Sequence, residues 1–285
     1  MSERTILFGA NSSLVGTLAL PDAANELLDI GLLLFNAGVI HRVGPHRINV
    51  RIARQLATHG VPSIRFDLAG HGDSARPSGN HSFEEQAVID IRSAMDALGA
   101  AAKIRRFAIF GFCSGAYYGY SAARADERVA GLLMFDAYRY PTPKTRVLHY
   151  WNRLHQPRAL SAVLQLGKRV ILRVARREVN ATRRMPSPAP ELGRIDFIPS
   201  KQDFAKGLHT LLTRGAKIHM IYSGGALREY NYAGQFADTF ASCGLGQRIQ
   251  ADFLPQLDHV VTSLADQADL TRRVTDWSLT LRPPG

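Results

Sequence analysis

The chain has 285 residues, 46% of them hydrophobic, which is enough to bury the core of one large domain. No run approaches the roughly eighteen apolar residues of a membrane-spanning helix. Residues 1–4 lead directly into strand-like sequence without a secretory signal, so we expect a cytoplasmic protein. The two cysteines, Cys113 and Cys243, lie far apart and have neither disulfide nor metal-site spacing. We expect neither a metal nor a cofactor.

The net charge of +11 is concentrated in one segment. Between Arg139 and Arg184 there are twelve lysines and arginines and a single acid, Glu178, an excess of eleven positive charges. The remainder of the chain is therefore close to neutral. A local basic patch says more about partners than a high overall isoelectric point does.

Apolar runs and helical periodicities alternate along most of the chain, which is typical of a doubly wound, mostly parallel sheet. The predicted strands are Thr5–Ala10, Leu14–Leu20, Ile30–Phe35, Val61–Phe66, Phe107–Phe110, Val129–Phe135, Lys217–Tyr222 and Arg248–Leu254. The predicted helices are Pro45–Gly60, Phe83–Leu98, Ala116–Ala125, Gln202–Thr213, Tyr230–Ser242 and Ser263–Leu279. The first two strands, joined by a short polar turn, predict an antiparallel hairpin at the sheet edge.

A segment bounded by prolines, residues 138–200, interrupts this alternation. Apolar residues recur in it at helical spacing, namely Val163, Leu166, Val170, Ile171 and Val174. Basic residues fall on the opposite side, namely Lys168, Arg169, Arg173, Arg176 and Arg177. We predict a helical, basic lid over 138–200, inserted between two parts of one core, 1–137 and 201–285.

A candidate nucleophile lies where the apolar strand Phe107–Phe110 leads into Gly-x-Cys-x-Gly, residues 111–115, and then into a helix. Strand, tight turn and helix form the context of a nucleophile elbow, in which Cys113 replaces the usual serine. Glycines at both ends of the motif allow the neighbouring strand and helix to approach closely. The positive end of the helix favours a thiolate.

A candidate general base follows the last predicted strand, where His259 stands in a loop before the final helix. A nucleophile at a strand end, a later acid and a final histidine form the chain order of α/β-hydrolases. Residues 61–74, the elbow and Asp258-His259 resemble that superfamily across nearly the whole chain. Three shorter stretches, residues 41–47, 111–116 and 149–154, resemble the cysteine-containing hydrolases associated with bacterial exosortase systems.

The third member of the triad departs from the family pattern. An acid is expected a few residues after the strand Lys217–Tyr222, but Ala226 stands there. Two carboxylates are alternatives: Asp136, which ends the strand after the elbow helix, and Glu229, slightly downstream of the usual position. We favour Asp136 because a strand end is more rigid than a loop.

An oxyanion hole needs two N–H groups, and we expect one from Ser114 and one from Gly38 or Val39. His46 and Arg47, at the start of the next helix, are candidates for binding an anionic part of the substrate, with ordinary solvation of a helix face as the alternative.

These features predict an esterase or thioesterase that works through an acyl-Cys113 intermediate, with His259 as general base. One alternative is an acyl or aminoacyl transferase that uses a carrier-protein thioester. Another is a non-catalytic scaffold that binds through the basic lid. For the lid itself we consider a solvated basic face, docking of an acidic carrier protein, or a peripheral membrane contact. Nucleic acid is the least favoured partner, because the basic stretch carries no recognition motif.

Overall fold

The computed structural model describes the whole chain except residues 23–25, 36, 78, 155–197 and 283–285. Eight strands form one sheet in the order β1-β2-β4-β3-β5-β6-β7-β8. Their bounds are β1 Ser2–Phe8, β2 Leu14–Leu20, β3 Gly31–Phe35, β4 Ser63–Phe66, β5 Phe107–Phe112, β6 Val129–Phe135, β7 Lys217–Ser223 and β8 Gln250–Leu254. Each predicted strand is present, with ends shifted by at most a few residues.

The sheet is antiparallel at one edge and parallel elsewhere. β1 pairs with β2, and β2 with β4, in antiparallel register, so the predicted edge hairpin is confirmed. The strands from β4 to β8 pair in parallel. All five residues of β3 are buried, as a fully apolar parallel strand requires when helices cover both faces of the sheet.

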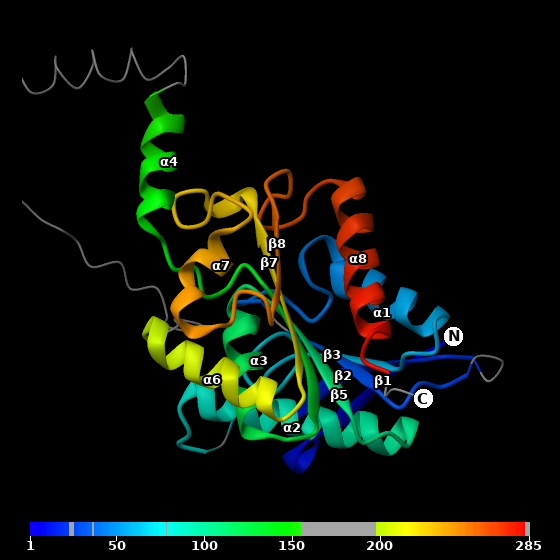
Figure 1. Ribbon diagram of the computed structural model, residues 1–285. Helices are drawn as coiled ribbons and strands as arrows, with labels where there is room; N and C mark the ends of the chain where they lie inside the picture. The colour runs from blue at the N-terminus through cyan, green and yellow to red at the C-terminus, as the bar shows by residue number, and fades with distance from the viewer. Residues whose placement is uncertain (23–25, 36, 78, 155–197, 283–285) are drawn as a thin grey trace, which may run out of the picture.

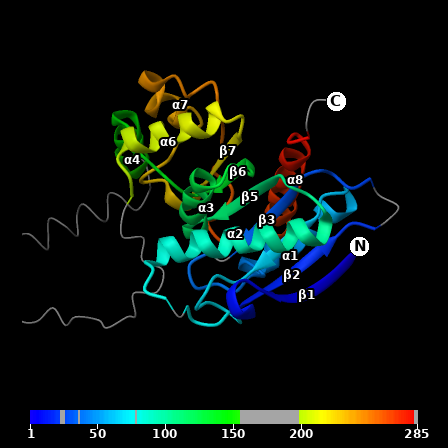
Figure 2. The ribbon, with the colours of Figure 1, turned by 90° about the horizontal axis from the view of Figure 1, so that it is seen from below.

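The helices form a layer on each face of the sheet (Figures 1 and 2). α1 and α8 share one buried cluster, and α2, α3 and α6 share the other. The helices are α1 Ile48–Thr58, α2 Phe83–Ala102, α3 Ser114–Ala125, α4 Pro143–Leu154, α6 Lys201–Thr213, α7 Gln235–Thr239 and α8 Leu264–Leu279. A capping box begins α2: Ser82 accepts from Glu85 N, and the Glu85 carboxylate accepts from Ser82 N. No helix in the described ranges is long and apolar enough to cross a membrane.

Two helix predictions need correction. Pro45 begins a 3₁₀ turn, Pro45–Arg47, with left-handed backbone at His46 and Arg47, and α1 begins only at Ile48. The helix expected over 230–242 shortens to α7. Gly234 is a poor helix former, and the preceding loop is instead held by the side chain of buried Gln235, which accepts from Asn231 N and donates to Glu229 O.

The predicted lid lies largely outside the described residues, and its basic positions 168, 169, 173, 176 and 177 all do. The described part of 138–200 includes α4, which projects away from the sheet (Figure 1). Its side chains Val147, Tyr150 and Trp151 are exposed.

The parallel arrangement determines where functional groups meet. Because parallel strands end at the same edge of a sheet, the segments that follow β3, β5, β6, β7 and β8 converge there. Every triad member considered from the sequence follows one of these strands.

Candidate active site

Cys113 occupies the sharp bend between β5 and α3. Its backbone has φ 52° and ψ −119°, a strained region for a residue with a side chain. Its N–H donates to Phe135 O at 2.9 Å, which ties the bend to the neighbouring strand. A Cβ at Gly111 would lie 2.4 Å from the Cα of Ala116, so glycine is required there. The elbow geometry expected from the sequence is present.

His259 is carried by a turn after β8 that its neighbour stabilises. The Asp258 carboxylate accepts from Val260 N at 2.8 Å and from Thr262 N at 3.0 Å. The imidazole lies beside two stacked rings, with ring centroids 6.0 Å from Phe112 and 6.5 Å from Phe135. Turn and rings together fix the histidine over the ends of β5 and β6.

Asp136 is the acid that meets this histidine. Its Oδ2 lies 2.7 Å from His259 Nδ1, and its side chain is fully buried. The residue follows β6 directly, with a left-handed φ of 56°, and its own N–H donates to Ile221 O at 2.8 Å. Ser223, at the end of β7, donates to the same carboxylate from its N–H at 2.7 Å and from its hydroxyl at 2.5 Å. Nothing in the sequence indicates this role of Ser223 beyond its place at a strand end.

Glu229, the alternative acid, has a different partner. Its carboxylate lies 2.7 Å from Arg139 Nε and is about half exposed. The segment after β7 is also closely packed: a Cβ at Gly225 would lie 2.7 Å from His259 Cβ, and one at Gly224 would lie 2.1 Å from Pro255 O. The structure thus brings Asp136, rather than Glu229, to His259.

The histidine and the thiol influence each other's protonation. The hydrogen bond with Asp136, followed by that with Cys113, raises the pKa of His259 to about 10, although burial opposes the shift. Burial alone would raise the pKa of the Cys113 thiol. The hydrogen bond and charge of His259, the N–H of Ser114 and the charge of Arg139 outweigh burial and lower it. Both directions favour a thiolate–imidazolium pair over the neutral pair.

The expected oxyanion donors lie close to the candidate nucleophile Cys113. Ser114 N–H contacts the Cys113 sulfur, and Gly38, with φ 56°, donates its N–H to Ser114 Oγ at 2.5 Å. Gly38 and the residue after the nucleophile are therefore neighbours. Val39, the other candidate, has a side chain that is 70% exposed, and no hydrogen bond of its N–H is recorded among the described residues.

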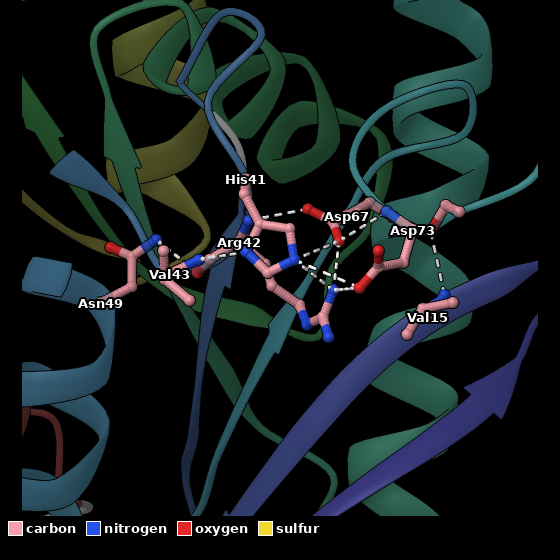
Figure 3. Close-up of polar contacts among 8 residues, drawn as sticks. Val15, His41, Arg42, Val43, Asn49, Asp67 and Asp73 are labelled. Carbon is pink, nitrogen blue, oxygen red and sulfur yellow. Dashed lines mark hydrogen bonds and ion pairs between the residues drawn. The ribbon is translucent and has the colours of Figure 1, made fainter.

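The loop that carries Gly38 is anchored at both ends by residues that the sequence reasoning missed (Figure 3). Asn49, buried in α1, donates to Phe35 O and Arg42 O, on either side of the loop. The buried carboxylate of Asp67 accepts from Arg42 N at 2.7 Å and from its Nη1 at 2.5 Å. Asp73 accepts from the same Nη1 at 2.6 Å. The signal available was Asp67, a charged residue directly after the apolar strand β4, together with Arg42 in the segment after the neighbouring strand β3.

One group of side chains in the described ranges has metal-like spacing: His41, Asp67 and Asp73, whose ligand atoms lie within 4.8 Å of one another. The guanidinium of Arg42 contacts both carboxylates and His41 Nε2 (Figure 3). The cation of this cluster is therefore Arg42, and the cluster fixes loop geometry.

His46 and Arg47, predicted near the substrate, are both exposed. Arg47 lines a hollow with Val50, Arg51 and Arg54 on α1. The hydrogen bond with Arg54 is the main cause that lowers the pKa of Glu3 on β1, and the charge of Arg47 acts in the same direction. The recorded contacts bring Arg47 to this basic face rather than to Cys113. Solvation of a helix face, the alternative weighed for this pair, agrees with their exposure.

A cysteine at a strand-to-helix bend, a histidine after the last strand and a buried carboxylate on a mostly parallel sheet form the arrangement typical of nucleophile-elbow hydrolases. The family model described as "Alpha/beta hydrolase family" matches residues 40–278. The chain belongs to the α/β-hydrolase family, which confirms the predicted fold class and the expectation of a hydrolase enzyme. No curated protein matches the sequence significantly.

Solved structures with the same architecture share little sequence with this chain. A serine hydrolase from Xanthomonas campestris, described as having no lid, gives a TM-score of 0.56 at 14% identity, covering 100% of this chain and 96% of its own. A serine hydrolase homologue from Coxiella burnetii gives 0.57 at 11% identity, covering 97% of each chain. An esterase domain from Rhodothermus marinus gives 0.54 at 16% identity, covering 97% of this chain and 98% of its own. At these identities the likeness concerns the fold.

Proposed function

We propose that this protein is a cysteine-dependent acyl hydrolase that cleaves esters or thioesters through an acyl-Cys113 intermediate. The observation that carries the proposal is the continuous chain from the Cys113 thiol through His259 to buried Asp136. The lowered pKa of Cys113 supports it, because the thiolate is the nucleophilic form.

In the acylation step, the Cys113 thiolate attacks the carbonyl carbon, a C–S bond forms, and the carbonyl oxygen takes the negative charge. The Ser114 and Gly38 N–H groups are placed to bind that oxygen, which then replaces Ser114 Oγ as the acceptor for Gly38. When the intermediate collapses, the bond to the leaving group breaks and His259 gives this group a proton. Asp136 holds His259 by Nδ1, so that Nε2 serves the reaction.

In the deacylation step, neutral His259 takes a proton from water as the water oxygen attacks the thioester. The C–S bond breaks, the acid leaves, and the thiolate–imidazolium pair is restored. An amine or thiol can collect the acyl group at this step, because thioesters react with these nucleophiles more readily than oxygen esters do. Transfer remains the second candidate function, and the nucleophile that collects the acyl group distinguishes it from hydrolysis.

The test is intact-protein mass spectrometry after brief exposure to a panel of acyl thioesters and aryl esters. We expect one added acyl mass, absent in Cys113→Ala and present in Cys243→Ala, which is the matched control for the second thiol. Acyl mass retained in Cys113→Ala would refute the assignment of the nucleophile. Adding amines or thiols to the acylated protein and identifying the product then separates transfer from hydrolysis.

A further inference from the structure

A basic hollow opens between α4 and the segment after β7. It has a volume of about 240 Å³ and is lined by Pro141, Arg146, His149, Tyr150, Arg228 and Glu229. Except for the proline, these side chains end in polar or charged groups. The guanidiniums, the imidazole and the phenol all offer hydrogen-bond donors.

The charge of this hollow is positive. Glu229 is the one carboxylate in the lining, and Arg139 compensates it at 2.7 Å. Arg146 and Arg228 therefore leave an excess of two positive charges even with His149 neutral. Guanidinium groups match phosphate oxygens in shape and bind them through paired N–H bonds.

The ion pair between Glu229 and Arg139 relates the hollow to the Cys113 thiol. Glu229 lies in its wall, Arg139 contacts Glu229, and the charge of Arg139 acts on Cys113. Arg139 also lies three residues after Asp136, the acid of the triad. An anion bound between Arg146 and Arg228 would thus sit outside the reacting centre, one side chain beyond the Arg139–Glu229 pair. That place suits a charged group on the arm that carries the acyl group.

We propose that this hollow binds a phosphate group on the thiol arm of a thioester substrate. This proposal rests on the proposed function for the role of the arm as acyl donor, but the binding itself needs no catalysis. Phosphorylated thiol arms occur free, as in coenzyme A thioesters, or attached to a carrier protein. Both sources present the same phosphate chemistry.

The test measures binding to the full chain carrying Cys113→Ala, which cannot be acylated on that residue. Pantetheine and 4′-phosphopantetheine differ by one phosphate, and their dissociation constants are compared by calorimetry at low salt. We expect the phosphorylated probe to bind at least about tenfold more tightly. Adding Arg146→Gln and Arg228→Gln should bring the ratio close to one. Adding Arg4→Gln, a charge loss on β1 at the opposite edge of the sheet, should leave it unchanged.

Equal affinities in the parent, or a ratio that survives the double substitution, would overturn the proposal. Kinetics then separate the two sources. A KM raised by the double substitution for coenzyme A thioesters supports recognition of the arm, whether or not carrier-borne donors respond. A KM raised for carrier-borne donors alone would overturn the phosphate assignment, because the arginines would then contact the carrier. If the affinity ratio holds but no acyl mass forms on Cys113, the proposed cysteine mechanism fails and the phosphate site stands.

Discussion

Ser223 donates two hydrogen bonds to the Asp136 carboxylate, one from its N–H at 2.7 Å and one from its hydroxyl at 2.5 Å. Both residues are buried, so water does not compete for these bonds. The strand β7, after which an acid is usual in this fold, here ends in a residue that orients an acid from the neighbouring strand. The position of Asp136, the hydrogen-bond partner of His259, is thus set by the ends of both β6 and β7.

Ser223→Ala should test this orientation. The substitution removes two hydroxyl bonds, one donated to Asp136 and one accepted from Gly225 N, and keeps the N–H bond to Asp136. We therefore expect a loss of about 2 kcal/mol in unfolding free energy. We expect kcat to fall about tenfold, because a less firmly oriented Asp136 supports His259 less well. KM should change little, because Asp136 acts through His259 and not on the substrate. Ser242→Ala, at an exposed serine, is the control. An unchanged kcat would show that the backbone bond suffices.

The pH profile should reveal the coupling of His259 to Asp136. The hydrogen bond with Asp136 is the largest cause that raises the pKa of His259, to about 10. Imidazolium therefore persists up to about pH 10 and is lost above it, so kcat/KM for acylation should fall on that alkaline side. In Asp136→Asn the alkaline limb should move to lower pH, with kcat/KM reduced about a hundredfold.

The same profile, recorded from pH 5 to 11, should be unchanged for Asp276→Asn, which removes an exposed carboxylate from α8. Glu229→Gln should cost less activity than Asp136→Asn. An alkaline limb that stays in place in Asp136→Asn would contradict the assignment of the acid.

Gly225→Ala should displace the histidine. A Cβ at Gly225 would lie 2.7 Å from His259 Cβ and 3.0 Å from its backbone nitrogen, so the His259 turn must shift. Because a misplacement of about 1 Å can cost about a hundredfold in rate, we expect kcat to fall by that order. Gly234→Ala is the matched control, since its Cβ would meet only Tyr232, at 3.9 Å. Equal activities of the two variants would show that the turn adapts without cost.

Asp67→Asn should loosen the loop that carries Gly38. Asp67 is buried and accepts two bonds from Arg42, so we expect a loss of about 3 kcal/mol in the free energy of unfolding by denaturant. Its partner carboxylate Asp73 is 59% exposed, and Asp73→Asn should cost less than about 1 kcal/mol. The kcat of Asp67→Asn should also fall, because one oxyanion donor is no longer held in place. Similar losses for both variants would contradict a special role for the buried carboxylate.

Local patterns in the sequence were enough to predict the strands of the sheet and the two candidate residues Cys113 and His259. Apolar runs located the central strands, and the glycines around Cys113 located the bend, because a tight strand-to-helix turn leaves no space for side chains there. Asp136 was favoured because a strand end is rigid, and the structure places it against His259. The roles of Ser223 and Arg42 depend on contacts between residues 87 and 25 positions apart, which no local pattern encodes. The helix expected from Tyr230 was too long because the buried Gln235 side chain holds the preceding loop.

The position of Asp136 leaves the segment after β7 free to change its side chains and, with them, the substrate preference. Cys113 follows β5 and Asp136 follows the adjacent strand β6, so neither the proposed nucleophile nor the proposed acid comes from the segment that follows Gly225. Leu227 and Arg228 are exposed there. Substitutions at these two positions should therefore leave Cys113, His259 and Asp136 in place. Libraries randomised at residues 227 and 228 should yield folded proteins with altered substrate preference.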